Sequence, residues 1–538
     1  MRLGLRTGAL AAALVLAVPW LASCGATATE SGIVRAKWGD PQNPLEPANT
    51  NEVNGGKVLD MIFRGLKVYN PETAEPEYAV AKSITSDDAQ NFKVTLKDGW
   101  KFADGSKVTS QSFVDAWNYA AYLPNAQIGA DFFGYIDGYD KLHPVKGKPS
   151  AKKLSGLKVV DDLHFTIKLN QKFSLFPDML GYAAFSPLPK KFFTDHDEWL
   201  EKPFGNGPYA VTDYERGGRM KLRLNHEYNG TKPRNKGVDL LVYTDDNTAY
   251  TDVVAGQLDV TDAVPAEQLS NLHKDIDNRY INTPAGIIQT LMFPMYDKRW
   301  DTADALKVRR GISLAINREQ ITDKIFQKTR IPAKDWTSPV LRDEGGYNPD
   351  ICGDRCEYDP KKAKQLIDEG GGFPGGKLVL SYNADTGNHK QWIDAICNSV
   401  NRVMGDSKAC VGNPVGTFAD FRTQIQSGKF SGPFRSGWQM DYPLIQNFLQ
   451  PVYTTGAPSN DGKWSDKRFD ALINKANADP DPKSAIKDFQ DSERILAEQL
   501  PAIPLWYQNG TAVYGTRVHD VKLNPFSVPV FEEMTVDD

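Results

Sequence analysis

The five cysteines are the residues whose chemistry the sequence defines most clearly. Cys24 follows small residues in Leu21-Ala22-Ser23-Cys24-Gly25, after an uncharged and mostly apolar stretch at residues 8–20. A stretch of this length is typical of a signal peptide and is short for a membrane span. The pattern is that of a lipobox, so we expect residues 1–23 to be removed and Cys24 to be lipidated. An ordinary signal peptide that happens to contain a cysteine is the alternative.

The other cysteines are Cys352, Cys356, Cys397 and Cys410. An even number of cysteines in an exported chain favours disulfide bonds. Local pairing, Cys352–Cys356 and Cys397–Cys410, is the simplest connectivity. A four-cysteine zinc site is the alternative, but no CxxC pair is present and the compartment is oxidising. We therefore expect disulfide bonds and no metal site.

The sequence contains no complete motif that would indicate catalysis. Residues 371–377 match the spacing of a phosphate-binding loop, but Leu378 stands where a serine or threonine would hold Mg²⁺. The sequence contains no H-E-x-x-H and no G-x-S-x-G, and its histidines are scattered. Acidic pairs such as Asp87-Asp88 lie beside turn signals, as on a solvated face. We expect neither an enzyme nor a cofactor.

Strand and helix signals alternate along the chain and predict an α/β protein. Residues 92–96 alternate apolar and polar side chains, as in a strand with one solvated face. Residues 240–243 show no such alternation, as in a strand that is covered on both faces. Thr109 can cap a helix whose apolar side includes Phe113 and Trp117. With 538 residues the chain is longer than one hydrophobic core usually supports, so two or more lobes are expected.

The charge and the hydropathy of the chain limit its partners. A net charge of -5 and an isoelectric point of about 5.9 argue against a nucleic-acid partner, which requires a basic face. After the signal peptide no apolar stretch approaches membrane-spanning length. Residues 24–35 read as a flexible tether, so we expect a membrane-anchored chain, held through acyl chains on Cys24.

Six short motifs, in a fixed order, suggest a family. They are residues 63–66 (F-R-G-L), 100–109 (W-K-F-A-D-G-S-K-V-T), 205–209 (G-N-G-P-Y), 256–259 (G-Q-L-D), 308–318 (V-R-R through A-I-N-R) and 501–505 (P-A-I-P-L). Together, between residues 36 and 525, they resemble the family 5 extracellular solute-binding proteins, which include bacterial oligopeptide- and dipeptide-binding proteins. The motifs are mostly structural, so they indicate the fold more than the ligand.

The resemblance implies a two-lobed, periplasmic-binding-protein-like fold (a venus flytrap) with an additional third domain. Lobe one would comprise residues 30–66, 203–290 and 507–538. The extra domain would be inserted at residues 67–202, and lobe two would comprise residues 291–506. We expect the lobes to close around a ligand, because a cleft shared by two lobes gains its contacts only when it shuts.

The segment Arg435 to Tyr442 resembles the part of peptide-binding members that lies in this cleft. The family's aspartate that pairs with the α-ammonium of a peptide matches Asp441. A buried carboxylate can hold that cation by a charge-assisted bond, while strand-like pairing holds the peptide backbone. The alternative for Asp441 is a turn cap before Tyr442-Pro443. Trp438 can either wall the cleft or pack beneath it.

Other ligand contacts follow from the resemblance with less support. Arg435 and His389 match positions that meet the carboxylate of the ligand, a role that suits the planar fork of arginine. A salt bridge within the lobe and a surface histidine are the respective alternatives. Lys298 is a further candidate for the carboxylate. A gapless match puts Asn51 at an acidic cleft position of the family, and Glu52, which stands next to it, is a further candidate for a contact with the peptide.

The function implied by the resemblance is that of the extracellular substrate-binding component of an ABC importer. Such a protein captures short peptides between its lobes and delivers them to the permease subunits, acting as a monomer. We expect an exported chain, anchored by lipid to the outer face of the cytoplasmic membrane. The alternatives are the same fold binding another solute, such as an oligosaccharide or a metal complex, and a receptor that senses peptides.

Overall fold

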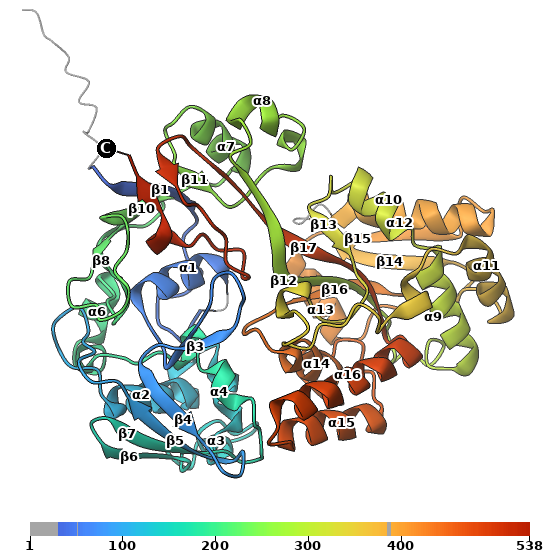
Figure 1. The fold of residues 1–538 in the computed structure, drawn as a ribbon. Coiled ribbons are helices and arrows are strands. Elements are labelled where there is room, and N and C mark those ends of the chain that lie inside the picture. Colours follow the sequence, from blue (N-terminus) through green and yellow to red (C-terminus); the bar gives the residue numbers. More distant parts are fainter. Residues whose placement is uncertain (1–30, 51, 385–388, 538) are drawn as a thin grey trace, which may run out of the picture.

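The computed structural model describes residues 31–50, 52–384 and 389–537 (Figure 1). The predicted signal peptide and Cys24 therefore lie outside the described residues. Helices and strands alternate along the chain, so the predicted α/β class is confirmed. Within the described residues, no helix combines the length and the apolar character needed to cross a membrane.

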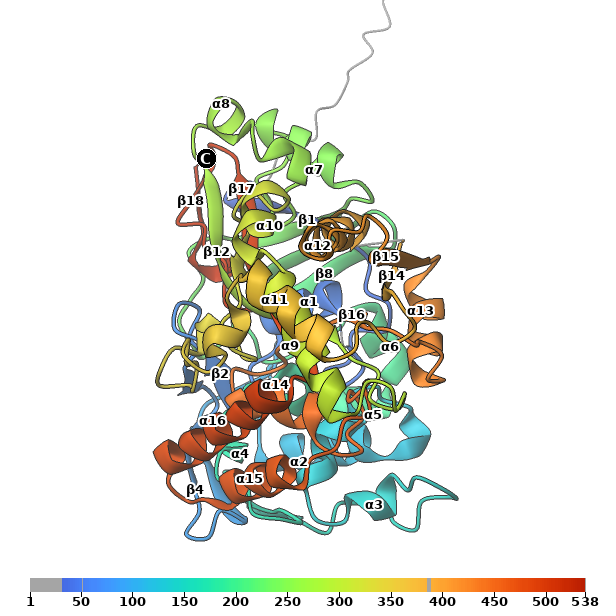
Figure 2. The ribbon, with the colours of Figure 1, turned by 90° about the vertical axis from the view of Figure 1, so that its right-hand side faces the viewer.

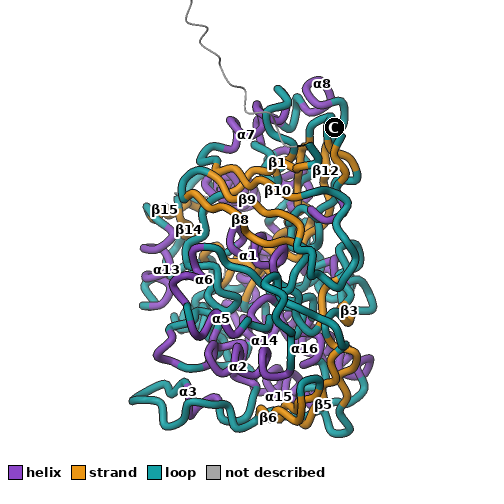
Figure 3. Tube along the Cα trace, turned by 90° about the vertical axis from the view of Figure 1, so that its left-hand side faces the viewer, coloured by secondary structure: helices purple, strands orange, loops and turns teal. Residues whose placement is uncertain are grey.

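The largest sheet has eleven strands in the order β15-β14-β16-β12-β17-β11-β1-β10-β9-β8, and β13 pairs with β17. Its strands are β1 (Ile33–Trp38), β8 (Tyr209–Glu215), β9 (Arg219–Leu224), β10 (Gly237–Val242), β11 (Val260–Thr261), β12 (Tyr280–Met292), β13 (Arg330–Pro332), β14 (Leu378–Asn383), β15 (Cys410–Val415), β16 (Phe434–Gln439) and β17 (Ala502–Tyr514). Figure 3 shows β1, β8, β9 and β10 in the upper half of the molecule, at the opposite end from β5 and β6.

Strands β12 and β17 connect the two parts of this sheet. They pair antiparallel along most of their length, with register shifts between Pro284 and Ile287 and between Gln289 and Thr290. The predicted lobe boundaries, at residues 290/291 and 506/507, fall inside these strands. The predicted lobes are therefore joined through one pair of hydrogen-bonded strands, and not through loops (Figure 1).

A four-stranded antiparallel sheet, in the order β4-β5-β7-β6, forms the centre of the predicted extra domain. Its strands are β4 (Ala81–Thr85), β5 (Asn91–Leu96), β6 (Leu157–Asp161) and β7 (His164–Lys168). Strand β5 contains the predicted alternation, with Phe92, Val94 and Leu96 buried. Thr109 caps helix α2 (Ser110–Ala121) as predicted, and its backbone N–H donates to Ser112 Oγ at 3.2 Å.

The remaining strands form two small hairpins, β2 (Lys67–Tyr69) with β3 (Pro76–Tyr78) and β18 (Val518–His519) with β19 (Thr535–Val536). Helices in the first half of the chain are α1 (Val53–Ile62), α3 (Tyr139–Leu142), α4 (Phe176–Met179), α5 (Lys190–Thr194), α6 (His196–Glu201), α7 (Asp246–Val254) and α8 (Leu272–Ile276). Those of the second half are α9 (Ala303–Ala315), α10 (Arg318–Lys324), α11 (Pro360–Glu369), α12 (His389–Met404), α13 (Phe418–Gln426), α14 (Ile445–Tyr453), α15 (Lys467–Ala478) and α16 (Pro482–Gln499). Helices α15 and α16 lie side by side at the base of the predicted lobe two (Figure 2).

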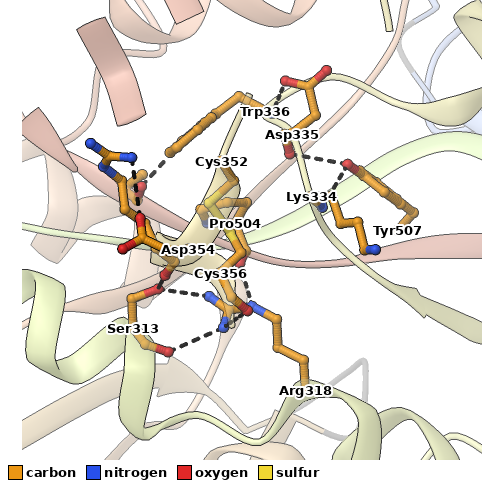
Figure 4. The surroundings of a disulfide bond; sticks show 12 residues. Ser313, Arg318, Lys334, Asp335, Trp336, Cys352, Asp354, Cys356, Pro504 and Tyr507 are labelled. Carbon is orange, nitrogen blue, oxygen red and sulfur yellow. Dashed lines mark hydrogen bonds and ion pairs between the residues drawn. A yellow bond between two sulfur atoms is a disulfide. The ribbon is translucent and has the colours of Figure 1, made fainter. Parts of the chain in front are cut away.

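Both predicted disulfide bonds, Cys352–Cys356 and Cys397–Cys410, are present. The first lies beside the buried side chain of Arg318 (Figure 4). The Arg318 guanidinium donates to the carbonyl oxygens of Pro504 at 2.9 Å and Cys356 at 3.0 Å. The same side chain thus ties the Cys352–Cys356 turn to the start of β17.

Removing the Cys397–Cys410 bond is expected to lower the free energy of unfolding by roughly 3 kcal/mol, because the bond closes a loop and so reduces the number of conformations of the unfolded chain. The bond joins residues separated by 13 positions, against 4 for Cys352–Cys356. A variant with serine at Cys397 and Cys410 should therefore lose more stability than one with serine at Cys352 and Cys356. Urea unfolding of both variants under non-reducing conditions measures this, and a reversed order would contradict it.

Candidate ligand-binding site

A cavity of about 200 Å³ lies where the three predicted domains meet. Predicted lobe one contributes helix α1 with the residues before it, and the segment near the C-terminus. The extra domain contributes the end of β2 and the loop after α4, and lobe two contributes the residues that follow β16. The lining residues are Thr50, Glu52, Val53, Gly56, Lys57, Leu59, Asp60, Tyr69, Gly181, Tyr182, Ala183, Gln439, Met440, Asp441, Phe526 and Val528.

Asp441 enters this cavity from the end of β16. The strand pairs with β12, and the Met440 N–H donates to the Gly286 carbonyl at 2.9 Å, so the sheet fixes the backbone up to this point. Asn447 of α14 then binds both the backbone and the side chain of Asp441. Its Oδ1 accepts the Asp441 N–H at 2.9 Å, and its Nδ2 donates to Asp441 Oδ2 at 3.0 Å.

The Asp441 carboxyl is enclosed and has no cationic partner among the residues that the structure describes. No lysine or arginine of the described residues forms an ion pair with it, and Asn447 is its hydrogen-bond donor. Burial raises the pKa of Asp441 to about 6, since removal of water disfavours the charged form, and the Asn447 hydrogen bond partly opposes this. A cation that enters the cavity would supply the missing partner.

Trp438 does not line the cavity. Its indole N–H donates to Asn447 Oδ1 at 3.1 Å, so Trp438 and Asp441 share this amide. The side chain is half-buried. This geometry fits packing beneath the site, the second of the two predicted roles. The link through Asn447 was not visible in the sequence.

Glu52 lines the cavity, but helix α1 already uses its carboxylate. It occupies the N-cap, and its oxygens accept the N–H groups of Asn54 and Gly55, both at 2.7 Å. A carboxylate at this position also complements the positive end of the helix dipole. Glu52 therefore positions α1 along the cavity, and its predicted contact with a ligand stays a prediction.

Arg435 lies on β16, away from the cavity lining. Its Nε donates to Asn383 Oδ1 at 2.8 Å, and its guanidinium lies over the rings of Phe418 and Phe421 at 5.0 and 5.1 Å. These contacts hold the guanidinium within the predicted lobe two. A contact of Arg435 with a ligand carboxylate stays a prediction.

His389 and Lys298 also lie outside the cavity lining. His389 begins the described part of α12, and its Nδ1 accepts the indole N–H of Trp392 at 3.1 Å. The Lys298 side chain is 82% exposed and pairs with Asp301 at 3.0 Å. The structure thus brings Asp441 and Glu52 together, and it does not bring His389, Lys298 or Arg435 to the same cavity.

Several lining residues were missed in the sequence analysis. Tyr69, Tyr182 and Phe526 give the cavity aromatic walls, and Asp60 adds a carboxylate to those of Asp441 and Glu52. The Tyr69 hydroxyl is held by the carbonyl of Asp178 at 3.0 Å. No local pattern marks these residues, because they come from segments far apart in the chain.

A second cavity, of about 390 Å³, adjoins the first. It continues between α1 and the C-terminal segment, where Arg64 pairs with Glu532 at 2.5 Å. The lining residues shared by both cavities are Lys57, Leu59, Asp60, Tyr69, Gly181, Ala183, Phe526 and Val528. The two spaces are therefore neighbours across one common wall.

Comparison with known proteins gives consistent matches over most of the chain. The family described as bacterial extracellular solute-binding proteins, family 5 Middle, matches residues 75–460. The oligopeptide-binding protein OppA of Bacillus subtilis is 24% identical over 488 residues, covering 87% of this chain and 86% of that protein. The dipeptide-binding protein DppE of the same organism is 26% identical over 500 residues, covering 90% and 88%.

Solved structures agree on the fold. The unliganded open form of the periplasmic murein tripeptide-binding protein MppA matches with a TM-score of 0.79 at 23% identity, covering 94% of this chain and 97% of that one. OppA of Haemophilus influenzae, in complex with the peptide RPPGFSPFR, matches with a TM-score of 0.75 at 19% identity, covering 95% and 99%. The predicted two-lobed fold with an additional domain is confirmed by these matches.

Proposed function

The chain belongs to the family 5 bacterial extracellular solute-binding proteins, and we propose that it is the substrate-binding component of an ABC importer. It captures short peptides in the cavity between the lobes and delivers them to the permease. The observation that carries this proposal is the Asp441 carboxyl, which is enclosed, oriented by Asn447 and without a cationic partner among the described residues.

A peptide of any sequence supplies what this site lacks. Its α-ammonium carries a fixed positive charge that can pair with Asp441 through a charge-assisted hydrogen bond. The peptide backbone offers donors and acceptors at regular spacing. Aromatic walls such as Tyr69 and Tyr182 can contact the peptide side chains without selecting for particular residue types. The names of the relatives OppA, DppE and MppA, which refer to oligopeptides, a dipeptide and a murein peptide, support the same class of ligand.

The finer features of the proposal concern the anchor and the assembly. We propose that Cys24 is lipidated and holds the protein at the outer face of the cytoplasmic membrane, as a monomer that binds and does not catalyse. The lipobox pattern at residues 21–25 supports the anchor. Fatty-acid labelling of cells that produce the wild type or Cys24→Ser tests this anchor. Equal labelling of the two proteins would contradict this part of the proposal.

A ligand panel tests the function itself. Thermal unfolding of the purified protein is followed with di- to pentapeptides, an oligosaccharide and a nickel complex, because a ligand that binds only the folded state raises the unfolding temperature. Peptides are expected to raise it. A shift with the oligosaccharide or the nickel complex, and none with peptides, would instead favour the same fold binding another solute.

Peptide affinity is expected to be highest between about pH 6 and pH 8. The ionised Asp441 is the binding form, and burial raises its pKa to about 6. As the pH falls through this value, Asp441 is protonated and loses its charge, so the peptide affinity falls up to about tenfold per pH unit. Above pH ~8 the peptide α-amine loses its proton, so affinity falls again.

Calorimetric titration from pH 5 to pH 9 measures this dependence. The peptide should lack basic side chains, since Glu52 and Asp60 also bring carboxyls to this cavity. Asp441→Asn is the control, and its affinity should not change on the acidic side. An affinity of the wild type that is constant from pH 5 to pH 7 would argue against an ionised Asp441 as the contact.

A further inference from the structure

The α-ammonium contact uses Asp441 and helix α1 uses Glu52 as its cap, which leaves Asp60 as the third carboxylate that lines the first cavity. It lies on α1 and lines both cavities, at their common wall. No donor or cation among the described residues pairs with its carboxyl, while its backbone carbonyl accepts from Arg64. The side chain of Asp60 is therefore available to a molecule in the cleft.

The structure of α1 does not require an acid at this position. The buried side of the helix is formed by Val58, Leu59, Met61 and Ile62, and Asp60 points away from it. The residue also stands in the last turn of the helix, which ends at Ile62. A negative charge there faces the negative end of the helix dipole, so the local effect on stability is unfavourable.

The lysine and arginine side chains that line the two cavities have other partners, and Lys232 donates to the Tyr228 carbonyl. Lys57, whose side chain is 2% exposed, pairs with Asp262 at 2.6 Å. Arg64 pairs with Glu532 at 2.5 Å. Farther along the second cavity, Arg234 pairs with the carboxylate of Asp520 at 3.0 Å. The negative charge of Asp60 is thus left without a dedicated partner in the described part of the chain.

Asp60 is an exposed residue that cleft solvent reaches, and it lies in the wall shared by the two cavities. The protein around the cleft displaces part of the water near the carboxyl and raises the pKa of Asp60 to about 6, helped by the nearby Glu532 and opposed by Arg64. A ligand that fills the cleft displaces the remaining water, so a charged partner then gains more here than on an open surface.

We propose that Asp60 determines specificity, by binding the charged end of a lysine or arginine side chain of the peptide. The inference rests on the proposed function and narrows it to basic peptides. Tyr69 and Phe526 line both cavities together with Asp60, so the aliphatic stem of a long basic side chain can lie along these rings. An arginine fork can then pair with both carboxylate oxygens.

Peptides that differ in one charge test this directly. Arginine and citrulline have nearly the same shape, but citrulline is neutral. Calorimetry compares Arg-Ala-Ala, Ala-Arg-Ala and Ala-Ala-Arg with the three peptides in which citrulline replaces arginine. At one position or more, arginine is expected to bind about tenfold more tightly, as for a well-formed and partly enclosed charge pair.

Two aspartate-to-asparagine variants separate Asp60 from general charge effects. Asp60→Asn is expected to reduce the arginine-to-citrulline ratio to below about threefold, because the paired charge is gone. Asp368→Asn is the matched control, since Asp368 is also an exposed aspartate in the last turn of a helix, α11, and does not line either cavity. The control should keep the ratio of the wild type. Thermal unfolding of each variant verifies that it is folded.

The outcomes distinguish this inference from the function on which it rests. If all peptides bind but arginine and citrulline are equal at every position, the role of Asp60 is overturned and peptide capture stands. A ratio that survives in Asp60→Asn overturns it as well. If no peptide binds to the wild type, peptide capture itself fails and the inference falls with it.

Discussion

Replacing Asp441 by alanine is expected to weaken the binding of short peptides by about thirtyfold or more, because loss of one partner of an enclosed charge pair costs roughly 2–5 kcal/mol. In the variant, the α-ammonium of the ligand loses its water without gaining a carboxylate. Asn447 also loses the acceptor of its Nδ2 donor. Calorimetric titration of the wild type and the variant with one peptide, at pH 7, measures the loss.

The variant Asp441→Asn separates the charge from the shape of the side chain. An amide keeps the size of the residue, and its oxygen can still accept from Asn447, so the turn after β16 should persist. A loss of affinity close to that of the alanine variant is therefore expected. If Asp441→Asn bound peptide as tightly as the wild type, the residue would be a turn cap and not a ligand contact.

Replacing Arg318 by alanine is expected to cost roughly 3–5 kcal/mol of folding stability, the largest stability effect that we predict from a single residue. The arginine is 3% exposed and reaches the carbonyls of Pro504, Cys356 and Ser313. Its Nη2 also donates to Ser313 Oγ at 2.9 Å (Figure 4). Alanine would leave these buried acceptors unsatisfied and open a cavity at the start of β17.

Arg318→Lys is the matched variant for this site. Lysine keeps the positive charge and part of the volume, but a single ammonium cannot reach acceptors that lie in several directions. We expect its loss of stability to fall between those of the wild type and of the alanine variant. Urea unfolding measures both, and an alanine variant within about 1 kcal/mol of the wild type would show that the network contributes little.

Local patterns in the sequence predicted those parts of the fold that depend on neighbouring residues. The alternation in β5, the cap of α2 at Thr109 and the disulfide Cys397–Cys410 each involve short separations along the chain, where periodicity and spacing are informative. Asp441 was found through its resemblance to a family segment, and the structure places it in the cavity where the predicted domains meet.

Contacts between distant segments could not be predicted in this way. Asp60, Tyr182 and Phe526 line one cavity only because the topology brings their three segments together. Arg435 carries the charge expected of a carboxylate contact, but the neighbouring strand offers it Asn383 as a partner. The predicted lobe boundaries, which follow from the family resemblance, fall inside the paired strands β12 and β17, and no local pattern in the sequence indicates this pairing.

The most direct test of the account is one calorimetric comparison on the wild-type protein, between a tripeptide and the same tripeptide acetylated at its α-amine. Acetylation removes the positive charge that Asp441 is proposed to bind and leaves the rest of the peptide unchanged. If Asp441 binds the α-ammonium, the acetylated peptide binds about thirtyfold more weakly or not at all. Equal affinity for both peptides would contradict this contact, because the α-ammonium would then contribute nothing to binding.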